Sequence, residues 1–84
     1  MITAKITVML KNGILDSQGK TVHHALENLG FGQIEDVRMG KIIELKFNGV
    51  SREEAEELTA GACKKLLANP VIEDYRIELV EDKR

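Results

Sequence analysis

Two adjacent histidines and a single cysteine are the side chains in this sequence best suited to metal binding or nucleophilic chemistry. His23 and His24 cannot share one metal ion, because neighbouring helical residues point about 100° apart, whereas paired ligands need an i, i+4 spacing. Cys63 stands beside apolar residues, which supply neither a base nor a positive charge to activate a thiol. We therefore interpret them as helix-surface histidines and a buried structural cysteine.

A run of glutamates and a pair of glycines complete the search for reactive groups. The carboxylates between Glu53 and Glu57 suit a cation by type, but they stand where a helix is expected to begin, and acidic residues stabilise that end of a helix. Gly30-Phe31-Gly32 follows a helix, whereas phosphate-binding glycines lie between a strand and a helix start. No nucleophile–base or acid–base pair is evident. We expect a chain with no catalytic residue, no bound cofactor and no metal.

Length and composition restrict the classes that remain. The chain has 84 residues, one cysteine and no tryptophan, so we expect a single domain (1–84) with an aliphatic core and no internal disulfide. A domain this small is marginally stable alone and gains from association with other chains. Its formal net charge of −2 lacks the basic excess that nucleic-acid binding needs. Short apolar runs, a free cysteine and no signal-peptide pattern predict a cytoplasmic protein with no membrane partner.

The first half of the chain predicts a strand followed by a helix. Apolar residues at every second position from Ile2 to Leu10 indicate a strand with one buried face. Asp16 is a suitable helix N-cap, because its carboxylate can accept the first backbone N–H groups. Gly30 suits the left-handed residue that follows a helix end. The helix between them has one apolar stripe, formed by Val22, Ala25, Leu26 and Leu29.

The second half predicts a hairpin and a second helix. Residues from about 34 to 47 indicate two strands joined by a tight turn at 39–41, the first of them shorter and more polar. Ser51 and Glu54 match a capping box at the start of the helix, which Pro70 ends. The apolar stripe of this helix is expected to be Ala55, Leu58, Ala62 and Leu66.

A last strand completes the expected fold. Alternation from Val71 to Leu79 indicates this strand, and residues 81–84 form a solvated tail. The order β-α-β-β-α-β with right-handed crossovers predicts an α+β, ferredoxin-like sandwich, in which two helices cover one face of a four-stranded antiparallel sheet. The opposite face would mix charged and apolar residues, which fits a protein-contacting surface about as well as a plain solvated sheet.

One turn stands out as a possible contact site. Residues 36–41 place Arg38 and Lys41 around a tight turn, where they could bind a carboxylate or phosphate of a partner. A solvated hairpin is the simpler alternative. Residues 67–75 likewise combine polar and apolar groups at the junction between the second helix and the last strand.

Three segments, in order and at natural spacing, resemble one known family. Residues 16–19 resemble its Asp-x-x-Gly element, and residues 36–41 resemble its Asp-Val-Arg-x-Gly-Lys hairpin. Residues 66–75 resemble its Leu-Leu-Ala-Asn-x-x-Ile-Glu-Asp-Tyr segment. The family is the PurS subunit of phosphoribosylformylglycinamidine synthase, and the resemblance covers nearly the whole chain except the more divergent region 48–60.

The resemblance implies a role in de novo purine biosynthesis. In that family a small non-catalytic subunit, as a homodimer or a dimer of dimers, joins the synthetase subunit (PurL) to the glutaminase subunit (PurQ) and helps ammonia pass between them. The complex uses ATP, Mg and glutamine, none of which this chain is expected to bind. The alternative is a dimeric small-molecule-sensing regulatory domain, because such modules share the expected fold.

The resemblance, with the turn described above, also gives a set of candidate partner-contact residues. They are Asp16, Gly19, Arg38, Gly40, Lys41, Asn69, Glu73, Asp74 and Tyr75. For three of them a structural role is an equal alternative: Asp16 and Asn69 as caps, and Tyr75 as part of the core.

Overall fold

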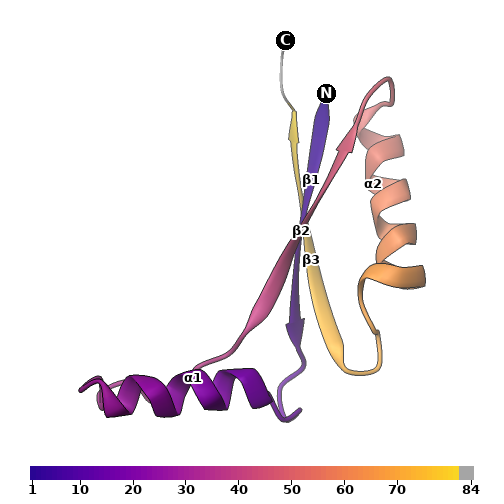
Figure 1. The fold of residues 1–84 in the computed structure, drawn as a ribbon. Helices are drawn as coiled ribbons and strands as arrows, with labels where there is room; N and C mark the ends of the chain where they lie inside the picture. Colours follow the sequence, from indigo (N-terminus) through magenta and orange to yellow (C-terminus); the bar gives the residue numbers. More distant parts are fainter. Residues whose placement is uncertain (82–84) are drawn as a thin grey trace.

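The computed structural model describes residues 1–81 and contains one three-stranded sheet and two α-helices (Figure 1). In chain order the elements are β1 (Ile2–Leu10), α1 (Ser17–Asn28), β2 (Gly40–Phe47), α2 (Arg52–Ala62), the short π-helical segment η1 (Cys63–Leu67) and β3 (Glu73–Glu81). The expected α+β class is confirmed. Residues 82–84 of the expected tail lie outside the described residues. Within 1–81, no helix has the length and apolarity to cross a bilayer.

Strand β1, with its alternating apolar residues, lies at the centre of the sheet. The strand order is β2-β1-β3, and β1 is antiparallel to both neighbours. Ile6 pairs with Ile43 on one side and with Ile77 on the other, so one row of apolar side chains crosses the sheet. Ile6 and Val8 are almost fully buried, and the core is built around them.

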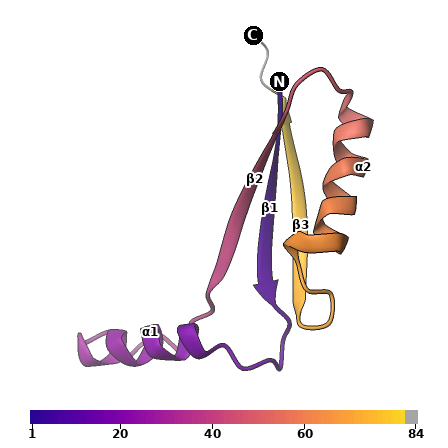
Figure 2. The same cartoon turned by 45° about the vertical axis from the view of Figure 1, so that its right-hand side comes forward.

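Helix α2 covers this apolar face over β1 and β3 (Figure 2). Its buried residues are Ala55 and Thr59, and Cys63 at the start of η1 is buried as well. The Thr59 hydroxyl donates a hydrogen bond to the Ala55 carbonyl oxygen at 2.7 Å. Of the expected stripe, Ala55 is therefore buried and Ala62 partly buried. Leu58 and Leu66 are 51% and 83% exposed. Leu58 lies about 60° round the helix from Ala55, since each residue advances by roughly 100°. Leu66 lies in the π-helical segment η1, where the α-helical stripe no longer continues.

The predicted fourth strand is not found among the described residues. Residues 33–39 have no regular secondary structure, and β2 has no strand on its outer edge. The two apolar residues expected to anchor this strand, Ile34 and Val37, are three positions apart and cannot share one face of a strand. Their carbonyl groups instead lie against α1, where His23 Nε2 is 2.7 Å from the Ile34 oxygen.

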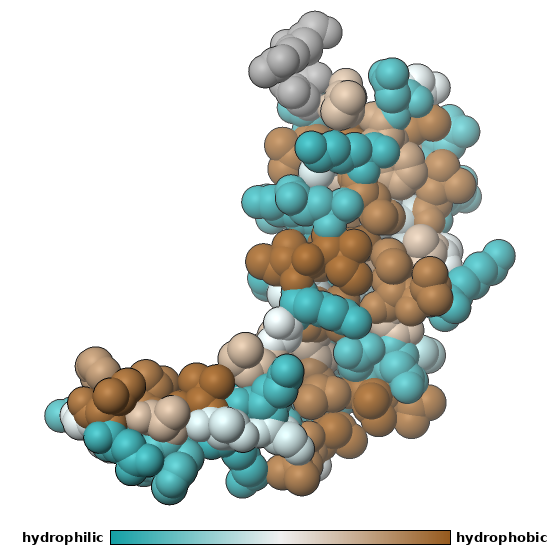
Figure 3. Space-filling view, viewed as in Figure 1, coloured by the Kyte–Doolittle hydropathy of each residue, from teal (hydrophilic) through white to brown (hydrophobic). Residues whose placement is uncertain are grey.

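The predicted pair of helices on one face is also wrong for this chain on its own. Helix α1 points away from the sheet and packs against neither the strands nor α2 (Figures 1 and 2). The radius of gyration is 16.5 Å, whereas a compact chain of this length is expected to have about 12 Å. In Figure 3 hydrophobic side chains gather on the side of α1 that faces the corner between helix and sheet. A single copy therefore leaves one helix and part of one sheet face uncovered.

Candidate functional site

The Asp16 carboxylate joins the start of α1 to the start of β2. Its Oδ1 atom accepts the Gly19 N–H at 2.8 Å, which is the N-cap bond expected from the sequence. Its Oδ2 atom accepts the Met39 N–H at 2.7 Å, across 23 residues of chain. These bonds, Met39 first and Gly19 second, together with the nearby Arg38 charge, hold the pKa of the Asp16 carboxyl below its ordinary value.

Two of the candidate glycines are required by close packing. A Cβ atom on Gly19 would collide with the Val37 carbonyl oxygen and would lie 2.6 Å from Asp16 Oδ2. A Cβ atom on Gly40 would collide with the side chain of Met9 and would lie 2.6 Å from the Val8 carbonyl oxygen. Real Cβ atoms do not approach oxygen so closely, so only glycine allows these chain segments to touch.

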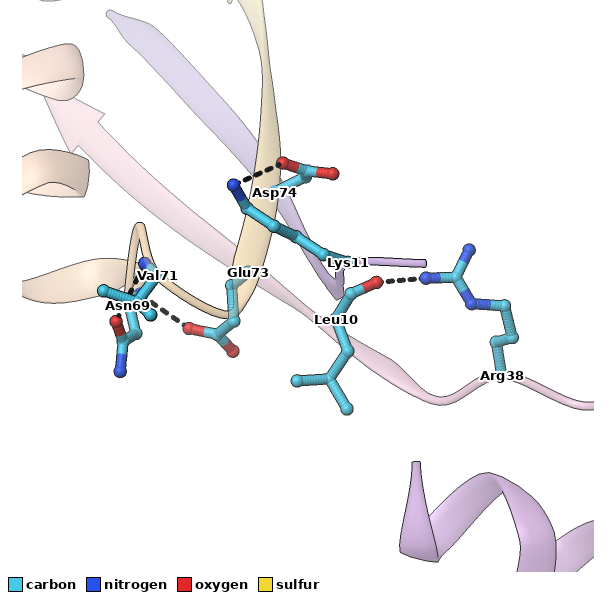
Figure 4. A network of polar contacts seen from close by, with 7 residues as sticks. All are labelled: Leu10, Lys11, Arg38, Asn69, Val71, Glu73 and Asp74. Atoms are coloured by element: carbon cyan, nitrogen blue, oxygen red, sulfur yellow. Dashed lines mark hydrogen bonds and ion pairs between the residues drawn. The ribbon is translucent and has the colours of Figure 1, made fainter. Parts of the chain in front are cut away.

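Arg38 and Lys11 connect this region to the end of β1 (Figure 4). The Arg38 guanidinium donates to the Leu10 carbonyl oxygen. The next residue, Lys11, donates its backbone N–H to the Ile72 carbonyl oxygen at 2.8 Å. Its ammonium group lies 3.9 Å from Asp74 Oδ1, in an exposed ion pair. Such an ion pair contributes little stability. The backbone bond from Lys11 to Ile72 and the Arg38 bond to Leu10 together join the end of β1 to the segments that precede β2 and β3.

Asn69 and Glu73 shape the turn that leads into β3. The Glu73 carboxylate accepts the Asn69 N–H at 2.7 Å, and the Glu73 N–H donates to the Asn69 carbonyl oxygen at 2.8 Å. The Asn69 side chain accepts the Val71 N–H at 3.1 Å. These contacts form a closed local turn of the kind that Asn favours. The structural alternative for Asn69, a local role close to the end of the helix, is the one its contacts support.

All nine candidate residues lie at one end of the sheet, where β1 ends and β2 and β3 begin. Tyr75 packs against the buried core, as its structural alternative predicted. Lys41 is exposed, and its side chain has no hydrogen bond or ion pair with the rest of residues 1–81. Most of the others use their polar groups or their small size within the chain. The nine residues named from the sequence thus gather at one end of the sheet, and their role in partner contact stays a prediction.

The sequence reasoning missed two residues at this end of the sheet. Lys11 is not among the candidate residues, although its place directly after β1 is a signal that it lies at the end of the sheet. His23 was interpreted as a surface residue, but it is half-buried and hydrogen-bonds to the Ile34 carbonyl group. No residue spacing in the sequence indicated the contact between His23 and Ile34.

A hollow of 380 Å³ lies beside Asp16 and Arg38. Its charged lining is balanced, with three basic side chains (Lys11, Lys20 and Arg38) and three acidic ones (Asp16, Glu35 and Asp36). This balance gives no preference for an anion or a cation. Within the described part of the chain, no three His, Cys, Asp or Glu side chains are grouped as a metal site would require.

Comparison with known proteins gives a consistent result. The family model for PurS, described as phosphoribosylformylglycinamidine (FGAM) synthase, matches residues 3–81. The PurS subunit of Bacillus subtilis is 44% identical over 81 residues, which cover 96% of this chain and 95% of that protein. The PurS subunit of Methanocaldococcus jannaschii is 40% identical over 79 residues, with coverage of 94% and 95%.

Solved structures agree in fold as well as in sequence. The crystal structure of Methanocaldococcus jannaschii PurS has a TM-score of 0.88 at 37% identity and covers 99% of this chain and 100% of that one. A chain in the structure of PurLQS from Thermotoga maritima has a TM-score of 0.82 at 27% identity, with coverage of 95% and 99%. The family model and the curated relatives both extend over nearly the whole sequence. The chain belongs to the PurS family of phosphoribosylformylglycinamidine synthase subunits.

Proposed function

We propose that this chain is the small bridging subunit of phosphoribosylformylglycinamidine synthase in de novo purine biosynthesis. It joins the ATP-dependent synthetase subunit to the glutaminase subunit and aids the transfer of ammonia between them. The observation that carries this proposal is the match to PurS over residues 3–81. The likeness to a chain of the Thermotoga maritima PurLQS structure supports the assembly with PurL and PurQ.

In this proposal the other subunits bind the reactants, and this chain positions those subunits. ATP, Mg and glutamine bind to the other subunits, and this chain contributes shape and surface. Holding two active sites in a fixed relation shortens the path of ammonia, so that it reacts before it is protonated or lost to solvent. Such an effect needs a rigid spacer and well-defined contacts, but no reactive side chain. We infer that the complex works in the cytoplasm, as expected from the free cysteine.

A homodimer completes the ferredoxin-like layer that one copy leaves open. In one copy α2 covers β1 and β3, while the helix-side residues of β2, among them Ile43 and Leu45, stay only half-buried. Since crossovers of this kind are right-handed as a rule, we expect the exposed flank of α2 and η1, with Leu58 and Leu66, to face this uncovered half. The second copy supplies its α1 to this groove, and a segment of it can pair with the free outer edge of β2.

The properties of α1 support this exchange. The helix has 12 residues, and an isolated helix of that length is marginal in water. Leu29, the residue directly after the end of α1, is 74% exposed in one copy, and Phe31 just beyond it is 51% exposed. A groove over β2 beside Leu58 and Leu66 would cover these side chains. Two copies would then bury two helices, and dimers of dimers would use the mixed opposite face.

The experiment that tests the bridging role is reconstitution of the amidotransferase. The purified synthetase and glutaminase are assayed for glutamine-dependent amidine formation with and without this chain. The same assay with ammonium chloride in place of glutamine is the control, because free ammonia needs no bridge. We expect the chain to raise the glutamine-dependent rate and to leave the ammonium-dependent rate unchanged. Equal glutamine-dependent rates with and without the chain would end the proposal.

The regulatory-domain alternative is not favoured, because the family match extends over nearly the whole chain. It makes a separate prediction, since a metabolite that binds the native state would raise the melting temperature of the isolated chain.

A further inference from the structure

Residues 16–39, which we call the arm, form one structural unit that consists of α1 and the segment that returns from it. The return segment lies along the first turns of α1, with the Val37 carbonyl oxygen against Gly19 and the Ile34 carbonyl oxygen 2.7 Å from His23 Nε2. The Asp16 carboxylate closes the arm at its base by accepting the Met39 N–H. The helix therefore cannot move relative to the sheet without carrying its return segment.

The base of the arm is fixed to the sheet by two contacts. Arg38, at the end of the return segment, donates to the carbonyl oxygen of Leu10, the last residue of β1 (Figure 4). Gly40, the first residue of β2, packs without a side chain against Val8 and Met9. One contact is polar and the other is steric, and together they set the angle at which the arm leaves the sheet.

The length of the connecting loop does not force this angle. Residues 11–16 connect β1 to α1, and a loop of that length serves either for a helix that folds back on its own sheet or for one that projects away. Short connections under strain are a common cause of segment exchange between copies. Residues 11–16 show no such backbone strain, because no residue among 1–81 other than glycine has a positive φ angle. The direction of the arm must therefore come from specific contacts.

We propose that Asp16, Gly19, Arg38 and Gly40 form a joint that holds the arm away from its own sheet and so commits α1 to the sheet of a second copy. This inference rests on the dimer proposed above and explains how the sequence selects it. A rigid arm presents α1 to the second copy in the conformation that binds. A loosened arm samples other directions, and the apparent affinity falls by the fraction of arms that remain correctly placed.

The joint can be tested with substitutions that spare the core. Arg38 is exposed, so Arg38→Ala removes its bond to Leu10 without opening a cavity. Gly19→Ala forces the return segment away from α1. Gly32→Ala is the matched control, because it lies in the same arm and a Cβ atom there meets nothing within 4 Å. Sedimentation velocity over a concentration series gives the dimer dissociation constant of each, and circular dichroism checks the helix content.

We expect Arg38→Ala and Gly19→Ala each to raise the dimer dissociation constant about tenfold or more, since two joints are weakened in every dimer. Gly32→Ala should stay within about twofold of the unsubstituted chain. If Gly19→Ala loses its helix, Arg38→Met, which keeps an unbranched side chain and loses the donor to the Leu10 carbonyl oxygen, replaces it. Unchanged dissociation constants in folded Arg38 variants would overturn the joint while leaving the dimer intact. A monomeric unsubstituted chain at 100 µM (an order-of-magnitude ceiling for a functional dimer) would overturn both.

Discussion

The substitution Leu29→Ala tests whether α1 is exposed, as it is in one copy, or buried against a second copy, as in an exchanged dimer. In one copy the Leu29 side chain is 74% exposed at the end of α1. Substitutions at such exposed positions usually change stability by about 0.5 kcal/mol or less. In the proposed dimer the same side chain would lie between β2 and α2 of the second copy and would contribute as a buried leucine does.

The magnitude follows from that burial. Truncation of a buried leucine to alanine costs about 2–3 kcal/mol at the lower end of the observed range. A symmetric dimer carries the change twice, so the free energy of association falls by about 4–6 kcal/mol. Since about 1.4 kcal/mol corresponds to a tenfold change, Leu29→Ala should raise the dimer dissociation constant by about a thousandfold or more. An effect of this size is well outside the error of the measurement.

The assay is sedimentation equilibrium or light scattering after size exclusion, from nanomolar to high micromolar concentration. Val71→Ala is the matched control, because Val71 is 77% exposed and lies in the turn before β3, outside both α1 and its groove. We expect the control to keep the dissociation constant of the unsubstituted chain. A Leu29→Ala dissociation constant within about threefold of the control would refute the burial of α1 in a second copy.

Four further changes have defined outcomes. Asp16→Asn removes a carboxyl whose folded pKa lies below its ordinary value of 3.8. The stability that this carboxylate confers is present above that value and is lost as pH falls through the lowered pKa. The free energy of unfolding of the variant, measured in urea, should therefore fall less as the pH is lowered than that of the unsubstituted chain. Gly61→Ala should raise the melting temperature by a few degrees, because a Cβ atom there meets nothing within 4 Å and alanine favours helix by up to about 1 kcal/mol. Burial raises the pKa of the Cys63 thiol, so a thiol reagent should label the native chain much more slowly than the urea-unfolded chain. Lys41→Ala should leave the dimer dissociation constant unchanged and weaken pull-down of the synthetase and glutaminase about tenfold; unaltered pull-down would remove Lys41 from the contact surface.

The parts of the fold that the sequence predicted well are those set by local rules. Alternation from Ile2 to Leu10 identified β1, and the caps Asp16 and Ser51 marked the starts of both helices with side-chain bonds to the expected turn. These features depend on neighbouring residues alone. The direction in which α1 leaves the sheet depends on contacts between Asp16 and Met39 and between Arg38 and Leu10, which are far apart in the sequence.

The error in α2 has a similar cause. Leu58 and Leu66 were expected in the core because they are large and apolar, whereas the expected stripe left out Thr59 and also Cys63, although Cys63 was separately interpreted as a buried cysteine. The structure buries the latter two and leaves both leucines exposed. A single helix wheel cannot distinguish a stripe that faces its own sheet from one that faces a second copy, since both are apolar. An apolar helix face wider than one sheet requires is therefore itself a sign of association.

The region of the candidate site was predictable from sequence, but the role of its residues was not. Asp16 and Gly19 belong to one motif, and Arg38 and Gly40 belong to another about twenty residues later, yet the structure brings both motifs to the same joint. A single sequence does not distinguish a residue that contacts a partner from a residue that stabilises the fold. Loss of complex formation in an Arg38 variant would therefore be ambiguous, because the loosened arm would also disturb the dimer. Lys41 carries no such ambiguity, since its side chain forms no bond within residues 1–81, and a loss of partner binding there would come from the contact itself.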